Sequence, residues 1–476
     1  MSDPLWQFTD LVAASGGRAD GAPSDAITGF TFDTRAIEPG GVFVALKDQR
    51  DGHDFVTTAF KNGASLAIVS DSYTRQPGDG ALLRTVDPLQ ALEKIGAAAR
   101  SRLSPGARVI AVTGSAGKTT TKEMLRACLT KVAPGHVHAS EKSYNNHWGV
   151  PLTLARMPSD TQYAVFEIGM NHANEIRPLT KMVRPHAAIV TTVEAVHLEH
   201  FANVEAIADA KAEIFEGLEE GGAAIIKRDN PHYGRLASHA SRVGATIVGF
   251  GFGRNADGAI IASVDTGDGS TITLNSRNGQ SITQFVAMPG HHNAENALAV
   301  AAVLDAVGAP LDLALAALAE LAPPPGRGAR TRLAAEDGDV LLIDESYNAN
   351  PASMRAALAT LATVSPQKFP RRIAVLGDML ELGPAAPQLH RDLFDAVDDA
   401  GVSLLFACGP LMKGLYDAAP SAMKGGYAAT AAELVPLVIS HIHAGDVLMV
   451  KASNGTKLGT LVDALKARFT QSEALH

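Results

Sequence analysis

The chain has 476 residues and a formal net charge of −9; apolar residues make up 46% of it and charged residues 19%. This length exceeds what one hydrophobic core supports, so two or three domains of a globular α/β protein are expected. The acidic balance, without a dense Lys/Arg stripe, argues against nucleic acid as a partner. Only Cys128 and Cys408 are present, which excludes a disulfide framework and fits a reducing, cytoplasmic compartment.

Neither secretion nor membrane insertion is predicted. Residues 1–17 lack a basic segment followed by an apolar run, so they do not read as a secretion signal. The most apolar stretch, 297–322, is interrupted by Asp305 and Asp312 and by a break at Gly308-Ala309-Pro310. It therefore predicts two packed helices of a soluble protein and no membrane span.

The first part of the chain predicts a small mixed α/β domain. Apolar runs at 41–46 and 66–69 are short and separated by turn residues, as expected for strands. A helix is expected over 88–103. The apolar run at 109–112 then predicts a buried parallel strand, which opens a second domain.

The central part of the chain alternates strand and helix patterns. Strands are expected at 163–166, 187–190 and 223–226, each followed by polar turn residues and a helical stretch. This alternation predicts a doubly wound parallel sheet, and the glycine-containing loop described below makes it one of the phosphate-loop ATPase type. Between Gly251 and Pro289, short β-type runs such as 270–274 predict an antiparallel extension of that sheet.

The clearest linker is Pro323-Pro324-Pro325-Gly326, since three prolines cannot continue the preceding helix. Beyond it, buried strands separated by Ala-rich helices predict a third, Rossmann-like domain. These strands are expected at 340–343, 373–376, 403–406 and 447–450. The predicted domains are therefore 1–86, 87–325 and 326–476.

The strongest local signal is a glycine-containing loop between a strand and a helix. It runs Thr113-Gly114-Ser115-Ala116-Gly117-Lys118-Thr119-Thr120, and the helix is expected to begin near Lys122. Backbone N–H groups of such a loop bind phosphates, its lysine pairs with the β- and γ-phosphates, and the next hydroxyl ligates Mg²⁺. Val112 stands where the usual spacing has its first glycine. The loop predicts a nucleoside triphosphate site; the alternative is an ordinary glycine turn.

Two polar residues follow buried strands of the same predicted sheet. Glu167 comes directly after the run at 164–166, and His197 follows the strand at 187–190. Ligands of doubly wound sheets bind beyond the carboxyl ends of the strands, so Glu167 is well placed as a Mg²⁺ ligand. On position alone, each residue also fits an ordinary surface role. The run His197-Leu198-Glu199-His200 lacks the spacing of a helical zinc motif.

Beyond the loop, further motifs stand at intervals along the chain. They are Tyr144-Asn145-Asn146-His147-Trp148-Gly149-Val150-Pro151, Phe166-Glu167-Ile168-Gly169-Met170, Ala195-Val196-His197-Leu198-Glu199, Ala210-Lys211-Ala212-Glu213-Ile214, Gly290-His291-His292-Asn293-Ala294-Glu295-Asn296-Ala297 and Gly326-Arg327. Together with the loop, and in this order, they resemble the Mur ligase family over nearly the whole chain. The resemblance implies an ATP-dependent ligase that activates a carboxylate as an acyl phosphate and joins it to an amine.

The resemblance implies ATP and two Mg²⁺ ions as cofactors. Lys118 and its loop neighbours would bind the ATP phosphates, and Thr119 and Glu167 would hold one Mg²⁺. His197 resembles a ligand of the second ion. Lys211 matches the family lysine that CO₂ carbamylates, which replaces a cation by an anionic group able to support that ion. An unmodified lysine beside Mg²⁺ would be electrostatically adverse.

The resemblance also implies nucleotide contacts on both sides of the linker. Asn293 and Asn296 match family positions near the adenine. Arg327 matches a hinge arginine near the phosphates, and Asp344 matches an acidic group at the ribose. Because these residues come from two domains, the site is expected to close by domain movement.

Candidate substrate contacts come from all three domains. In the first, Asp33-Thr34-Arg35 and Lys47 resemble the segment that holds a uridine diphosphate group; without the resemblance they are polar turns beside strands. Asn145 and Asn146 would contact the bound precursor. Tyr347 and Asn348 of the third domain complete the candidate set.

The third domain indicates which branch of the family the chain resembles. Asp344-Glu345-Ser346-Tyr347-Asn348-Ala349-Asn350-Pro351 and Leu376-Gly377-Asp378-Met379-Leu380-Glu381-Leu382-Gly383 resemble members that join D-alanyl-D-alanine to UDP-N-acetylmuramoyl-tripeptide. These two molecules are the implied partners of a chain expected to act as a monomer. Tripeptide-forming members usually carry Asp-Asn-Pro-Arg in this domain. Here Asp229-Asn230-Pro231 lies in the central domain and is followed by His232.

Alternative functions remain at two levels. Within the family, a tripeptide-forming or folate-polyglutamylating ligase is the nearest alternative. On the loop alone, the alternatives are a kinase or a regulatory switch, although the Asn-Lys-x-Asp motif of guanine-reading switches is absent. One departure concerns Lys451-Ala452-Ser453-Asn454: the family often has glycine at the second position, where a tight turn favours it, and this chain has Ala452.

Overall fold

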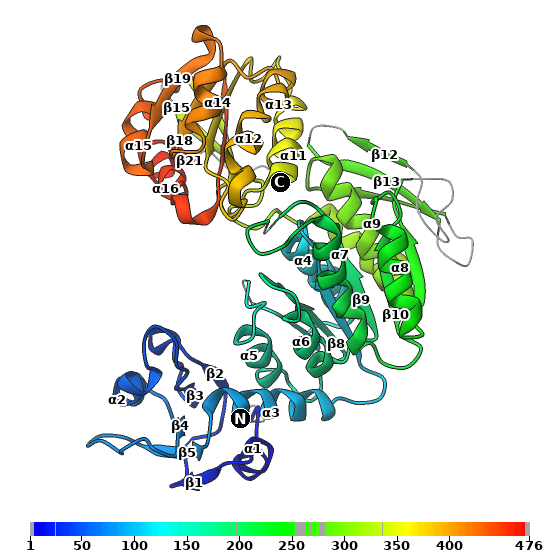
Figure 1. Cartoon of the computed structure of the whole chain (residues 1–476), viewed down its shortest axis with the longest axis vertical. Helices are drawn as coiled ribbons and strands as arrows, with labels where there is room; N and C mark the ends of the chain where they lie inside the picture. Colours follow the sequence, from blue (N-terminus) through cyan, green and yellow to red (C-terminus); the bar gives the residue numbers. More distant parts are fainter. Residues whose placement is uncertain are drawn as a thin grey trace.

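The computed structural model of the chain describes residues 4–23, 25–141, 143–196, 198–252, 262–265, 268–275, 281–335 and 337–471. The N-terminal and C-terminal lobes lie at opposite ends of the molecule with the central lobe between them (Figure 1). Each lobe contains its own main sheet. The predicted α/β class with three such units is confirmed, and we retain 1–86, 87–325 and 326–476 as proposed domain boundaries.

The N-terminal sheet has five strands in the order β1-β5-β4-β3-β2; β1 is antiparallel to β5 and the other pairs are parallel. Its elements are α1 (Phe8–Ser15), β1 (Arg18–Asp20), β2 (Gly29–Thr31), β3 (Gly41–Val44), α2 (Val56–Lys61), β4 (Leu66–Ser70) and β5 (Ala81–Thr85). Trp6 ties this lobe to the central one. Its indole N–H donates to the Ala155 carbonyl at 2.9 Å, and the Arg102 guanidinium lies 3.6 Å from its ring centroid.

The central sheet has six parallel strands in the order β11-β10-β9-β6-β8-β7. Its strands are β6 (Arg108–Thr113), β7 (Val137–Ala139), β8 (Tyr163–Glu167), β9 (Ala187–Val190), β10 (Ala223–Lys227) and β11 (Thr246–Phe250). The helices are α3 (Pro88–Ser101), α4 (Lys118–Val132), α5 (Gly149–Ala155), α6 (Ile176–Val183), α7 (Val204–Ala212), α8 (Tyr233–Arg242), α9 (His291–Ala306) and α10 (Leu311–Leu315).

Alternation along β6 explains why helices cover both faces of the central sheet. Val109 and Ala111 belong to a core shared with α3, α5 and α6, whereas Ile110 and Val112 belong to a core shared with α4 and α9. Successive strand residues point to opposite faces, so an uninterrupted apolar run needs a cover on each side. The predicted doubly wound arrangement is therefore confirmed.

Two details of the central lobe differ from the sequence-based expectation. Helix α4 begins at Lys118 and not near Lys122, because Gly117, in a left-handed conformation with φ of 81°, ends the loop directly before it. The expected antiparallel extension of the sheet is wrong, since β12 (Ala262–Asp265), β13 (Ser270–Asn275) and β14 (Ser281–Val286) form a separate three-stranded sheet.

The separate sheet packs on the side of the central sheet that α9 covers. Ile272, Leu274 and Val286 are buried in the same core as α9, and the Ala287 N–H donates to the Leu318 carbonyl. Packing against a helix buries the apolar face of this small sheet, whereas pairing at the edge of the central sheet would not. Residues 253–261, 266–267 and 276–280 of the predicted extension lie outside the described residues.

The C-terminal sheet has seven strands in the order β19-β18-β17-β20-β16-β15-β21; the β16–β15 and β15–β21 pairs are antiparallel and the other pairs are parallel. The strands are β15 (Ala329–Ala335), β16 (Gly338–Glu345), β17 (Arg371–Gly377), β18 (Leu404–Cys408), β19 (Lys424–Ala428), β20 (Asp446–Lys451) and β21 (Thr470–Gln471). The helices are α11 (Pro351–Ala362), α12 (Ala386–Arg391), α13 (Phe394–Asp399), α14 (Lys413–Ala418), α15 (Ala431–Ile439) and α16 (Gly459–Arg468). The Rossmann-like prediction is thus confirmed.

The most apolar stretch of the sequence forms the later part of α9, the short helix α10 and a 3-10 helix at Ala316–Ala319. Helices α9 and α10 are separated by a turn at 307–310, as predicted from the glycine and proline there. Among the helices of the described residues, none combines the length and the apolar character needed to cross a bilayer.

Candidate functional site

The predicted phosphate loop joins the end of β6 to the start of α4. Gly114 and Gly117 have φ values of 151° and 81°, which side-chain-bearing residues rarely adopt, and a Cβ atom at Gly114 would lie 1.8 Å from Oγ1 of Thr191. Lys118 donates from Nζ to the Gly114 carbonyl at 2.6 Å. The sequence therefore needs glycine at both positions to turn the backbone into the N-terminus of α4.

Thr119 and Glu167 meet where β6 and β8 end. The Thr119 hydroxyl donates to Oε2 of Glu167 at 2.8 Å, and the Asn145 amide donates to Oε1 of the same carboxylate at 2.8 Å. The Glu167 backbone N–H donates to the Ser140 hydroxyl at 3.1 Å. Glu167 is only 1% exposed, so its orientation is fixed by these contacts.

This pair of oxygen donors fits one Mg²⁺ ion. A hydroxyl and a carboxylate are hard ligands, and Mg²⁺ is typically bound by one or two protein oxygens together with substrate phosphates and water. Across the part of the chain that the structure describes, no three His, Cys, Asp or Glu side chains gather to form a metal cage. His197, the predicted ligand of a second ion, lies outside the described residues, so that site stays a prediction.

Lys211 is buried on α7 and is 2% exposed. Burial lowers the pKa of its amine well below the usual value, and the nearby charge of Lys118 acts in the same direction. Burial likewise lowers the pKa of Lys118; Glu167 opposes this shift and Arg327 reinforces it. The charge of Lys118 thus adds to burial in disfavouring the protonated form of Lys211.

The third domain supplies the opposite wall of the site. Tyr347 donates from its hydroxyl to Oγ of Ser143 at 3.0 Å, a contact between residues of different domains. The Arg327 guanidinium lies 4.3 Å from the centroid of the Tyr347 ring, which holds this predicted hinge arginine at the domain junction. Tyr347 and Arg327 were predicted from the sequence, whereas Ser143 was not.

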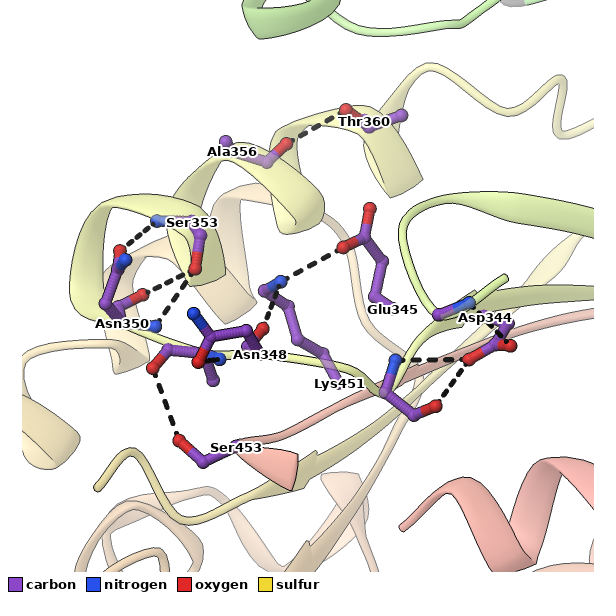
Figure 2. A network of polar contacts seen from close by, with 12 residues as sticks. Asp344, Glu345, Asn348, Asn350, Ser353, Ala356, Thr360, Lys451 and Ser453 are labelled. Atoms are coloured by element: carbon purple, nitrogen blue, oxygen red, sulfur yellow. Dashed lines mark hydrogen bonds and ion pairs between the residues drawn. The ribbon is translucent and has the colours of Figure 1, made fainter. Parts of the chain in front are cut away.

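A partly buried ion pair between Lys451 and Glu345 organises this wall (Figure 2). Lys451, which is 2% exposed, donates from Nζ to Oε2 of Glu345 at 3.0 Å and to the Asn348 carbonyl at 3.1 Å. Ser453 donates to the Ala349 carbonyl at 3.3 Å. These bonds fix the segment from Glu345 to Ala349 against the end of β20.

The Asp344 carboxylate accepts hydrogen bonds from residues of its own domain. It accepts the Gly326 N–H at 3.0 Å and both the hydroxyl and the N–H of Ser346, at 2.6 and 3.1 Å. The residue is 5% exposed. Its contacts hold the linker glycine against β16, whereas the expected ribose contact stays a prediction.

A cleft of about 890 Å³ runs between the central and third domains, and we call it the interdomain cleft. This volume lies within the range of small-molecule sites. The predicted residues that line it are Ser115, Ala116, Gly117, Lys118, Thr119, Thr120, Asn145, Glu167, Asn293, Asn296, Arg327, Tyr347 and Asn348. Gly114, Asn146, Lys211 and Asp344 are not among its lining residues.

The four predicted residues of the first domain are also not brought to the interdomain cleft. Asp33 pairs with Arg35 at 2.7 Å, and Lys47 pairs with Asp51 at 3.5 Å. The Arg35 and Lys47 side chains are 87% and 75% exposed, so both cations face solvent. The Thr34 carbonyl accepts the Asn62 amide at 2.9 Å.

The sequence reasoning missed several cleft residues. Thr191, Thr192 and Glu194 line the cleft beyond the end of β9, where the rule about strand ends could have found them. Arg355 on α11 lines it without any local motif. Ala452 adopts no positive φ, and its Cβ lies beside Gly377, so the backbone at this position does not require a glycine.

The phosphate loop of the central domain faces the Rossmann-like third domain across the cleft. This arrangement is typical of ATP-dependent ligases built from three domains. Family models match as the Mur ligase middle domain over residues 112–304 and as "Mur ligase, glutamate ligase domain" over 329–454. The chain is also 38% identical over 415 residues to the UDP-N-acetylmuramoyl-tripeptide--D-alanyl-D-alanine ligase of Escherichia coli, covering 86% of each chain.

A second relative and a solved structure agree with this match. The ligase of the same name from Rickettsia prowazekii is 32% identical over 91% of this chain and 94% of its own. A crystal structure of MurF from Acinetobacter baumannii superposes with a TM-score of 0.83 at 30% identity, covering 97% of this chain and 99% of that one. The chain belongs to the Mur ligase family, as its motifs predicted.

The lowered pKa of Lys211 gives a stability prediction. Between that lowered value and about 10.4, the unfolded chain binds more protons than the folded chain, so the free energy of unfolding rises with pH. Lys211→Met removes the buried amine. In CO₂-free buffer the variant should be more stable than the parent at pH 7, by a margin that shrinks towards pH 10.

Urea unfolding midpoints at pH 7 and pH 9.5 measure this difference. Lys61→Met, at an exposed position on α2, is the matched control. A Lys211→Met variant that is less stable than the parent by the same amount at both pH values would contradict the prediction.

Proposed function

We propose that this chain joins D-alanyl-D-alanine to UDP-N-acetylmuramoyl-tripeptide, with ATP converted to ADP and phosphate. The observation that carries the proposal is the interdomain cleft, in which the phosphate loop and the Thr119–Glu167 pair face Tyr347 and Asn348. Relatives that bear the name of this reaction are similar over nearly their whole length. The product is the pentapeptide precursor of peptidoglycan, used in cell-wall growth and division.

The cleft provides what the activation step needs. The terminal carboxylate of the tripeptide attacks the γ-phosphorus of ATP, so an acyl phosphate forms and ADP leaves. Lys118 and the N-terminus of α4 offset the repulsion between the carboxylate and the phosphate chain. Mg²⁺ held by Thr119 and Glu167 would further neutralise the phosphate oxygens.

The joining step needs the second substrate in the same cleft. The amine of D-alanyl-D-alanine attacks the acyl carbon, the carbon–oxygen bond to the phosphate breaks, and phosphate leaves as the amide forms. Residues from two domains line the cleft, so closure can bring the amine and the acyl group together. Orientation of this kind contributes several powers of ten to the rate.

Lys211 is proposed to act as a carbamate. Its lowered pKa favours the neutral amine, which is the form that attacks CO₂; a nitrogen–carbon bond forms and a proton is released. The product carries a negative charge where the bare lysine would place a positive one. That charge would support a second Mg²⁺ together with His197.

The first domain is proposed to hold the uridine diphosphate end of the precursor. Arg35 and Lys47 present exposed cations there, as a diphosphate group requires. Cys128 and Cys408 are buried and unpaired, which fits the cytoplasmic location expected for an enzyme that uses nucleotide substrates.

Phosphate release tests the proposed function. With ATP, Mg²⁺ and UDP-N-acetylmuramoyl-tripeptide, the chain should release phosphate only when D-alanyl-D-alanine is added, and the pentapeptide should be seen by mass. Release without the dipeptide, or with L-lysine or glutamate in its place, would instead favour another acceptor or a kinase.

An added carboxylic acid should partly restore the activity that is lost when the proposed carbamate is removed. Lys211→Ala is expected to lower the rate at least about a hundredfold, because the second Mg²⁺ loses its anionic support. A short-chain carboxylic acid should restore part of the rate by filling the vacated space with a carboxylate. An unchanged rate in Lys211→Ala would remove this residue from the mechanism.

A further inference from the structure

Asp229 and Asn230 lie in the turn after β10, behind two segments that line the interdomain cleft. The Asp229-Asn230-Pro231 triplet has no role in the reaction as described so far. Neither Asp229 nor Asn230 lines the cleft. Each side chain nevertheless contacts a segment that does, and the two segments come from different strands.

The Asn230 side chain holds the segment that follows β9. Its amide Nδ2 donates to Oγ1 of Thr192 at 3.2 Å and to the Val193 carbonyl at 3.0 Å. Its Oδ1 accepts the His232 N–H at 2.9 Å. Asn230 is 6% exposed, so an amide is needed here to donate on one side and accept on the other.

The segment from Thr191 to Glu194 is bonded in turn to the phosphate loop. The Ser115 N–H donates to the Thr192 carbonyl at 2.9 Å, and the Glu194 N–H donates to Oγ of Ser115 at 2.9 Å. Thr191 donates from Oγ1 to the Ala116 carbonyl at 2.5 Å. Asn230 therefore acts on the phosphate loop through one intervening segment.

Asp229 contacts the other segment, which follows β11. Its Oδ2 accepts the Phe252 N–H at 2.9 Å, and Gly251 approaches so closely that a Cβ atom there would lie 2.3 Å from the same oxygen. The Phe252 ring stacks on His291, with centroids 4.4 Å apart and an interplanar angle of 28°. His291 lines the cleft on the N-terminal turn of α9, two residues before Asn293.

We propose that Asp229 and Asn230 are positioning residues for the bound nucleotide. Asn230 fixes the backbone amides of the phosphate loop, and Asp229 fixes the Phe252–His291 stack beside the expected adenine position. One turn after β10 thereby sets the spacing between the phosphate and base ends of the ligand. The inference rests on the proposed function in that ATP is taken as the ligand of this cleft.

Nucleotide binding without turnover tests this inference. Asn230→Asp replaces the donor amide by a carboxylate that cannot donate to Val193, and Asp229→Asn weakens the acceptor for Phe252. Each should reduce the affinity for ADP with Mg²⁺, measured by calorimetry, roughly tenfold.

One matched control variant and one further test variant guard against general damage to the fold. Asn62→Asp makes the same exchange where an amide donates to the Thr34 carbonyl, and it should leave the ADP affinity unchanged. Asn230→Ala removes the donor without adding charge and serves if Asn230→Asp does not fold. In both Asn230 variants, KM for ATP should rise while KM for D-alanyl-D-alanine stays within about twofold of the parent.

The outcomes separate the inference from the proposed function. ADP affinities within twofold of the parent in both Asn230 variants would overturn the inference and leave the ligase assignment intact. Equal increases in KM for all three substrates, together with a fall in thermal stability, would show a merely structural role and also overturn it. A parent chain that binds no ADP would contradict the proposed function itself.

Discussion

The hydrogen bond between Thr119 and Glu167 is the contact on which the rest of the site depends. It joins the first turn of α4 to the end of β8, so it fixes where the phosphate loop lies relative to the acidic strand end. Both residues are buried, and a buried carboxylate without such partners would be costly. Asn145 completes the arrangement from a third segment. The strand order of the sheet brings these segments together, and any bound phosphate must meet them as a set.

Chemistry at this centre requires a second wall, which the central domain cannot provide. The third domain places Tyr347 across the cleft and holds its neighbours through the Glu345–Lys451 ion pair. A site divided between domains can admit large substrates when open and exclude water when closed. The Tyr347–Ser143 hydrogen bond is one of the contacts across the junction, where α11 also lies against α9.

Much of the fold followed from the sequence, because apolar runs of four or five residues could form only buried strands between helices. The phosphate loop and Asn293 were found because each lies within a local motif. Glu167 was found because it stands at the end of a buried strand. The separate β12–β14 sheet was missed because the sequence shows strands without showing what they pair with. The cleft role of Arg355, and the link from Asn230 through Thr192 to Ser115, depend on contacts between distant segments that no local pattern records.

The central claim is that the carboxylate of the tripeptide is activated by phosphorylation within this cleft. Transfer of isotopic oxygen tests it most directly: UDP-N-acetylmuramoyl-tripeptide is labelled with ¹⁸O in its terminal carboxylate, and the phosphate released with D-alanyl-D-alanine is analysed by mass. An acyl phosphate passes one carboxylate oxygen to the phosphate, so the account predicts one ¹⁸O atom in each molecule formed from labelled carboxylate. Phosphate free of ¹⁸O, with pentapeptide formed, would contradict it.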